Sequence, residues 1–68
     1  MTIREVMAEM EKNGAIEKAE MGKRIFVFVK DAQKAKALIT ELIPYKVRNV
    51  MGGTVYNVRG RIIELYYE

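Results

Sequence analysis

The chain of 68 residues contains no cysteine, histidine, serine or tryptophan. Without cysteine no disulfide can form, and without cysteine and histidine a typical zinc site has no ligands. The same absences exclude Ser–His and Cys–His nucleophilic catalysis and remove the most frequent general base. Asp31 is the only aspartate and is expected to cap a helix, and no two glutamates have a spacing that defines a metal site. We therefore expect a protein that is not an enzyme and that holds neither a metal nor another cofactor.

Long apolar runs are absent as well. No stretch approaches the roughly 20 apolar residues that a membrane-spanning helix needs. The N-terminal sequence MTIREVMAEMEK carries too many charges for a signal peptide. We expect no membrane contact and a cytoplasmic location. Glutamine is scarce, whereas lysine, glutamate, isoleucine, valine and tyrosine are abundant, which is typical of proteins from thermophiles.

The small size of the chain bears on its assembly. Sixty-eight residues allow a single domain, 1–68, with no room for a linker. A chain of this length buries only about 60% of the surface that its unfolded form exposes, so its core needs support. Since disulfides and zinc are excluded, oligomerisation is the remaining means of support, and we expect a homodimer.

Two amphipathic segments predict helices. Thr2-Ile3-Arg4-Glu5 has the pattern of a capping box, apolar residues then follow at helical spacing, and Asn13-Gly14 ends the segment, which predicts a helix over 3–12. Asp31 is a good N-cap for a second helix over 32–42, and Pro44 prevents this helix from continuing.

Four further segments, and the end of the chain, favour strands. The run Ile25 to Val29 is β-branched or aromatic at every position, as in a central strand, and the charged segment 15–20 before it resembles an edge strand. Segments 45–51 and 54–59 flank Gly52-Gly53, which predicts a hairpin. Residues 61–68 alternate as a strand does, although a short terminal helix also fits the pattern.

Met-Gly occurs at positions 21–22 and again at 51–52, each time before a strand. This spacing suggests two repeat-like halves, 1–30 and 31–60, followed by a C-terminal segment, 61–68. The predicted fold is α+β: a two-layer α/β sandwich in the order α-β-β-α-β-β plus the terminal segment, with an antiparallel sheet and both helices on one of its faces.

The expected hairpin decides which strand residues face the helices. With Gly52-Gly53 as the loop, one face of the sheet carries Val47, Met51, Tyr56 and Val58, and we expect Phe26 and Phe28 to join them under the helices. The opposite face then carries an apolar patch, and the end of the chain extends it. We predict that this patch is the dimer interface, formed by Ile25, Val27, Val29, Val50, Val55, Leu65 and Tyr67.

No motif in the chain is diagnostic of a function, but its charge is unevenly distributed. The net charge is +3, and residues 21–63 carry nine basic side chains against two acidic ones. This asymmetry is typical of a surface that contacts phosphates. We predict a small nucleic-acid-binding protein, a homodimer, that contacts DNA or RNA through a basic sheet face. The predicted contact residues are Lys23, Arg24, Lys46, Arg48, Asn57, Arg59 and Arg61.

An alternative function is a protein–protein interaction or structural module that self-associates through the apolar sheet face. The two functions are compatible, because a sheet-to-sheet dimer would join two basic ends. A basic surface without a nucleic-acid partner fits the composition equally well. Nothing in the sequence indicates a small-molecule substrate, and no glycine-rich turn precedes a helix with a phosphate-binding lysine.

Overall fold

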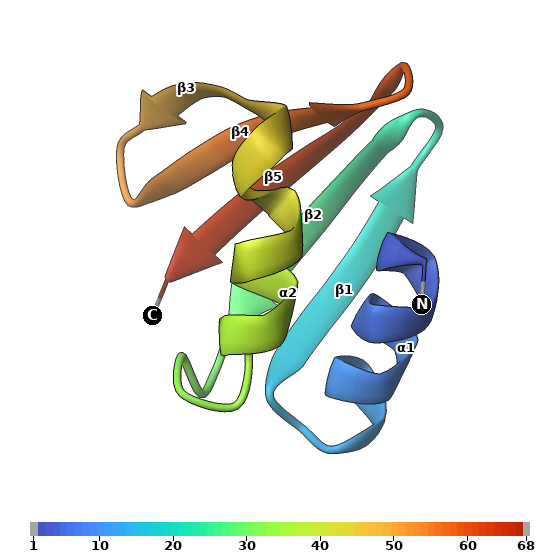
Figure 1. Cartoon of the computed structure of the whole chain (residues 1–68), viewed down its shortest axis with the longest axis vertical. Coiled ribbons are helices and arrows are strands. Elements are labelled where there is room, and N and C mark those ends of the chain that lie inside the picture. The colour runs from blue at the N-terminus through green and yellow to red at the C-terminus, as the bar shows by residue number, and fades with distance from the viewer. Residues whose placement is uncertain (1, 68) are drawn as a thin grey trace.

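The computed structural model describes residues 2–67 and shows two α-helices and a five-stranded mixed sheet (Figure 1). The strand order across the sheet is β1-β2-β5-β4-β3. The elements in chain order are α1 (Ile3–Lys12), β1 (Ile16–Met21), β2 (Arg24–Val29), α2 (Lys36–Leu42), the 3₁₀ turn η1 (Ile43–Tyr45), β3 (Lys46–Val50), β4 (Gly53–Val58) and β5 (Arg61–Tyr67). Neither described α-helix is long and apolar enough to cross a membrane.

Helix α1 begins and ends where the sequence predicts. The Thr2 hydroxyl accepts a hydrogen bond from the Glu5 amide at 3.1 Å, which satisfies one of the free N–H groups of the first turn. At the other end Asn13 is the C-cap and Gly14 has a φ of 80°, a conformation that costs little without a Cβ. The predicted bounds of this helix are confirmed.

Helix α2 is shorter than predicted. It begins at Lys36 instead of residue 32, and Ala35 at its N-cap makes no side-chain cap. Asp31 does cap, but it caps the preceding turn, because its Oδ1 accepts hydrogen bonds from the amides of Gln33 and Lys34. The prediction identified the right capping residue and placed the helix start one turn too early.

The end of the chain forms the central strand of the sheet. Residues 61–67 are strand β5, which confirms the strand and not the helix for this segment. β5 pairs antiparallel with β4 and parallel with β2. The prediction of an antiparallel sheet is therefore wrong for β2 and β5. The charged strand β1 lies at the edge, as predicted.

The loop of the β3–β4 hairpin lies one residue earlier than predicted, which shifts the pairing of the two strands by two residues. Its loop is Met51-Gly52, and Val50 pairs with Gly53. Gly53 is therefore a strand residue, and a Cβ at this position would collide with the backbone carbonyl of Leu65 on β5. The close approach of β4 to β5 requires glycine here, which is why Gly53 belongs to the strand and only Gly52, with a φ of 81°, belongs to the turn. The repeat of the two chain halves is not confirmed.

One face of the sheet and both helices enclose the core. In Figure 1 α2 crosses in front of the central strands and α1 lies beside β1. Val6 and Met7 from α1 and Leu38 and Leu42 from α2 belong to one buried cluster with Tyr56 of β4, whose predicted face is confirmed. The other strand residues of this cluster are Ile16, Ile25, Val27, Val29, Ile63 and Leu65.

Strand β2 presents the opposite face to the helices from the one predicted. Its β-branched residues lie in the core, and Phe26 and Phe28 therefore point to the other side of the sheet. Val47 and Met51, also expected under the helices, are 60% and 98% exposed. The reason for the reversal is the pairing with β5: Ile25 lies opposite Ile63 and Val27 opposite Leu65, so the aliphatic residues of both strands face the helices together.

This reversal changes the predicted dimer patch. Ile25, Val27, Val29 and Leu65 are buried inside the chain, so they form no surface patch. By register, Val50 and Val55 lie on the face away from the helices, as predicted. Tyr67 pairs with Val29, so its side chain lies on the helix side of the sheet, and it is 45% exposed.

Candidate nucleic-acid interface

The sheet face away from the helices carries an aromatic and aliphatic surface, which we call the uncovered face. Strand register places its residues opposite one another on neighbouring strands, since directly paired residues share a face. Phe26 pairs with Glu64 and Phe28 with Tyr66, while Val55 pairs with Glu64 from the other side. The uncovered face thus comprises Phe26, Phe28, Val55, Ile62, Glu64 and Tyr66, with Arg24, Arg48 and Asn57 around them.

Two aromatic rings stack on the uncovered face. The centroids of Phe28 and Tyr66 lie 5.9 Å apart with an interplanar angle of 25°. Phe28 is 42% exposed, and Tyr66 is half-buried. The two residues lie opposite each other on the adjacent strands β2 and β5. The backbone pairing of these strands fixes the positions of the two rings. Such a surface can stack against flat π-systems.

Glu64 lies at the centre of the uncovered face. Its Oε1 accepts a hydrogen bond from the Tyr66 hydroxyl at 2.8 Å, and its Oε2 lies 3.6 Å from Nη1 of Arg24. The side chain is 13% exposed, and Oε2 is buried without a hydrogen bond. The hydrogen bond to Glu64 raises the pKa of the Tyr66 hydroxyl above 10.0, burial and the carboxylate charge act in the same direction, and the Arg24 charge opposes them. The uncovered face therefore offers one buried carboxylate acceptor.

The predicted basic residues gather mainly at one end of the sheet. Figure 1 shows the β1–β2 and β4–β5 turns side by side, and the Ile62 amide donates to the Lys23 carbonyl at 2.9 Å. These turns bring Lys23 and Arg24 close in space to the segment of Arg59 and Arg61, as expected for one phosphate-contacting region. We call this region the basic end.

The other three predicted contacts lie on β3 and β4. Arg48 pairs with Val55, so it borders the uncovered face far from the two turns. Asn57 also lies on the uncovered face, but its Oδ1 accepts a hydrogen bond from the Gly60 amide, so this oxygen already has a partner. Lys46 begins β3, at the point where the strand register shifts.

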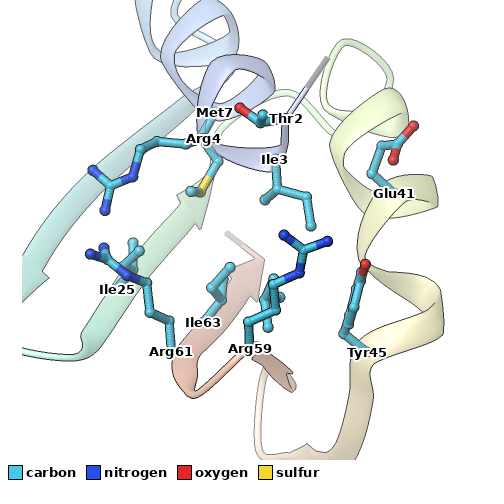
Figure 2. A pocket seen from close by; sticks show the side chains of 11 residues that line it. Thr2, Ile3, Arg4, Met7, Ile25, Glu41, Tyr45, Arg59, Arg61 and Ile63 are labelled. Carbon is cyan, nitrogen blue, oxygen red and sulfur yellow. The ribbon is translucent and has the colours of Figure 1, made fainter.

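Arg59 and Arg61 reach to the helix side of the molecule. They line a cavity of about 420 Å³ together with Arg4 at the start of α1 (Figure 2). Arg4 was not predicted as a site residue, because in the sequence it looks like an ordinary exposed residue of an amphipathic helix. Arg59 and Arg61 are thus separated by the sheet from the aromatic rings, and the predicted basic residues do not form one continuous basic face.

The aromatic residues of the uncovered face were also missed. Phe26 and Phe28 were expected in the core because every position from 25 to 29 is apolar. A signal was present in this run: aliphatic β-branched residues occupy the odd positions and aromatic residues the even ones. Among residues 2–67 no cluster of three or more acidic, cysteine or histidine side chains is placed to hold a metal ion.

No protein-family model matches this chain, and comparisons with curated proteins and with solved structures give no significant match.

Proposed function

We propose that the protein binds single-stranded nucleic acid, with bases stacked on the uncovered face and phosphates contacted from the basic end and from Arg48. The observation that carries the proposal is the stacked pair of Phe28 and Tyr66 on a sheet face that neither helix covers. Aromatic side chains on an open sheet stack with unpaired bases, and every base offers a π-face.

The charge of the protein supports a polyanionic partner. The net charge is +3, and Lys23, Arg59 and Arg61 lie near the start of β2 and β5, at the opposite end of these strands from the stacked rings. A strand whose bases lie on β2 and β5 can place its backbone against this end, where phosphate contacts contribute most of the affinity. The proposed function is binding and involves no catalysis.

A duplex is a poorer partner than a single strand for this surface. In a duplex the faces of the bases are stacked on one another, so Phe28 and Tyr66 could not reach them. We therefore expect a single strand of DNA or RNA to bind more tightly than a duplex of the same sequence.

The proposal predicts that Phe28→Ala and Tyr66→Ala each weaken binding of a labelled single-stranded oligonucleotide by about 5- to 150-fold, since one stacked base contributes about 1–3 kcal/mol. Fluorescence anisotropy measures the affinity. Met51→Ala is the matched control, because Met51 is exposed in the β3–β4 turn. Equal affinity of wild type and both aromatic variants would contradict the proposal.

Self-association through the uncovered face is the competing function. Phe28 and the half-buried Phe26 and Ile62 give the uncovered face an apolar character, so two copies could pack sheet against sheet. Such a dimer would bury Phe28 and Tyr66. The two functions therefore compete for one surface in this fold, and a homodimer formed in this way would not bind single strands.

A further inference from the structure

A second candidate site lies on the helix side of the sheet, opposite the uncovered face. The start of α1, the 3₁₀ turn η1 and the β4–β5 turn surround the cavity of about 420 Å³ (Figure 2). A volume of this size is within the range of small-molecule sites. Arg59 and Arg61 of the basic end also line this cavity, but the aromatic rings that carry the proposed function do not, so the following inference rests on other contacts.

The charged groups of the cavity favour an anion. Its lining contains three guanidinium groups and one carboxylate, Glu41, which gives 3 − 1 = +2. Arg4 shares its charge with Glu20, whose Oε1 lies 3.4 Å away. Within residues 2–67 neither Arg59 nor Arg61 forms an ion pair. In Figure 2 both side chains extend over the cavity, Arg61 toward Ile25 and Arg59 toward Ile3.

The backbone at Arg59 indicates that its side chain serves a purpose other than turn formation. Arg59 and Gly60 form the two-residue loop between β4 and β5, with φ values of 54° and 87°. Two positive φ values are the pattern of a type I′ turn, in which asparagine followed by glycine is preferred. Arginine in this conformation costs stability, and non-glycine residues in such conformations cluster at functional sites.

The floor of the cavity is apolar. Ile3, Met7, Ile25 and Ile63 lie beneath the guanidinium groups, and the Tyr45 ring forms one wall. A bare inorganic anion would leave this surface in contact with water. An anion attached to an organic ring or chain would cover it, and the arginines would hold the charged group at the rim.

We propose that this cavity binds a phosphate monoester carried by an organic group of nucleotide size. A phosphate monoester is close to doubly charged at neutral pH and accepts paired hydrogen bonds from guanidinium groups. The first turn of α1, which contributes Thr2, Ile3 and Arg4 to the lining, adds the partial positive charge of a helix N-terminus. The same chemistry is present in a free nucleotide and in the 5′-phosphate at the end of a strand.

Isothermal titration calorimetry with the whole chain tests the proposal and separates these two sources. The probes are adenosine 5′-monophosphate, adenosine, and one short oligonucleotide with and without a 5′-phosphate. In at least one of the two pairs, we expect the phosphorylated probe to bind at least about tenfold more tightly than the unphosphorylated one. A difference for the nucleotide alone assigns a small-molecule ligand, and a difference for the oligonucleotide alone assigns the end of a strand.

Two variants test the residues. Arg59→Asn should reduce the preference for phosphate about tenfold or more and should raise the urea midpoint of unfolding, since asparagine suits the turn better. Arg61→Gln should reduce the preference without the gain in stability. Lys34→Gln is the control, because Lys34 is exposed, does not line the cavity and should leave the preference unchanged.

Equal binding of phosphorylated and unphosphorylated probes would overturn the proposal. So would a preference for phosphate that survives in both Arg59→Asn and Arg61→Gln. The result is independent of the uncovered face: Phe28→Ala should leave binding of adenosine 5′-monophosphate unchanged, so failure of one site does not imply failure of the other.

Discussion

Glu64 and Tyr66 show how single residues set the character of the uncovered face. A carboxylate at the centre of an apolar sheet face is costly unless it has partners. Here one oxygen accepts from Tyr66, and the other lies near Arg24 without a hydrogen bond. We expect this second oxygen, which is buried beside Arg24, to accept a hydrogen bond from a bound base that displaces Arg24, and so to give this face a preference beyond stacking.

The first prediction concerns base preference. Cytosine carries an amino group at position 4 where uracil carries a carbonyl, so cytosine can donate a hydrogen bond to Glu64. We expect oligocytidine to bind more tightly than oligouridine, by about fivefold or more, since a good base contact contributes about 1–3 kcal/mol. Anisotropy titrations of the two oligomers measure the ratio.

Glu64→Gln is the variant that tests this assignment. Glutamine keeps an acceptor for Tyr66 and adds an NH₂ donor, which suits the uracil carbonyl and not the cytosine amino group. The ratio of the affinities for oligocytidine and oligouridine should therefore shift in favour of oligouridine. An unchanged ratio would show that Glu64 does not contact the base.

The second prediction is a pH dependence of stability. The pKa of Tyr66 is raised in the folded protein, so its contribution to the free energy of unfolding is complete below the unfolded value of about 10 and is lost as pH rises through the raised pKa. Urea unfolding at several pH values measures the free energy of unfolding of wild type and of Tyr66→Phe. The difference between the two should be constant below pH 10 and should become smaller above it.

Tyr67 is the internal control for the hydrogen-bond assignment. The pKa of Tyr67 is also raised, but its main cause is burial and its hydroxyl has no contact with Glu64 in the described structure. Glu64→Gln should therefore lower the pKa of Tyr66 and leave that of Tyr67 in place. Equal responses of the two tyrosines in an NMR pH titration would contradict the hydrogen-bond assignment.

At the scale of elements, local signals in the sequence predict α1 and the terminal strand well. Thr2, Asn13 and Gly14 mark the ends of α1 by chemistry that needs no distant partner. The alternation in residues 61–67 likewise predicts a strand with Ile63 and Leu65 on one side, and both are core residues.

The elements that sequence reasoning placed wrongly depend on distant neighbours. In β2 every position from 25 to 29 is apolar, so hydrophobicity does not indicate which side faces the helices, and only the alternation of aliphatic and aromatic residues distinguishes the two sides. Gly52 and Gly53 are equivalent as turn residues, and only the approach of β5 makes Gly53 a strand residue. The parallel pairing of β2 with β5 joins segments more than 30 residues apart, for which the sequence carries no local signal. For the candidate site, the sequence identified the arginines and lysines of the basic end, but not the aromatic rings.

The third prediction tests the packing of β4 against β5. Gly53→Ala places a methyl group against the Leu65 carbonyl, and neither backbone can move without breaking the sheet. We expect a loss of about 3 kcal/mol or more, enough to abolish cooperative unfolding of so small a domain. The added methyl group of Gly52→Ala contacts no other atom. This variant should lose only about 1 kcal/mol of the free energy of unfolding, because of the positive φ at this position. Circular dichroism during urea unfolding compares the two variants, and similar losses in both would contradict the register of this hairpin.

At the scale of the whole molecule, the sheet separates two surfaces of different chemistry. One face is aromatic and is proposed to bind bases, and the other bears the helices and the arginine-lined cavity. The basic end lies where both surfaces meet, so one strand can in principle place its bases on β2 and β5 and its terminal phosphate near Arg59 and Arg61. This arrangement needs only one chain.

The molar mass in solution tests the central claim most directly. Light scattering at about 50 mM and about 200 mM salt, with and without a single-stranded oligonucleotide, distinguishes the two uses of the uncovered face. We predict a monomer of 7.9 kDa that gains the mass of one oligonucleotide at low salt and loses it at high salt. A dimer that persists at both salt concentrations and ignores the oligonucleotide would contradict the proposal and would assign the uncovered face to self-association.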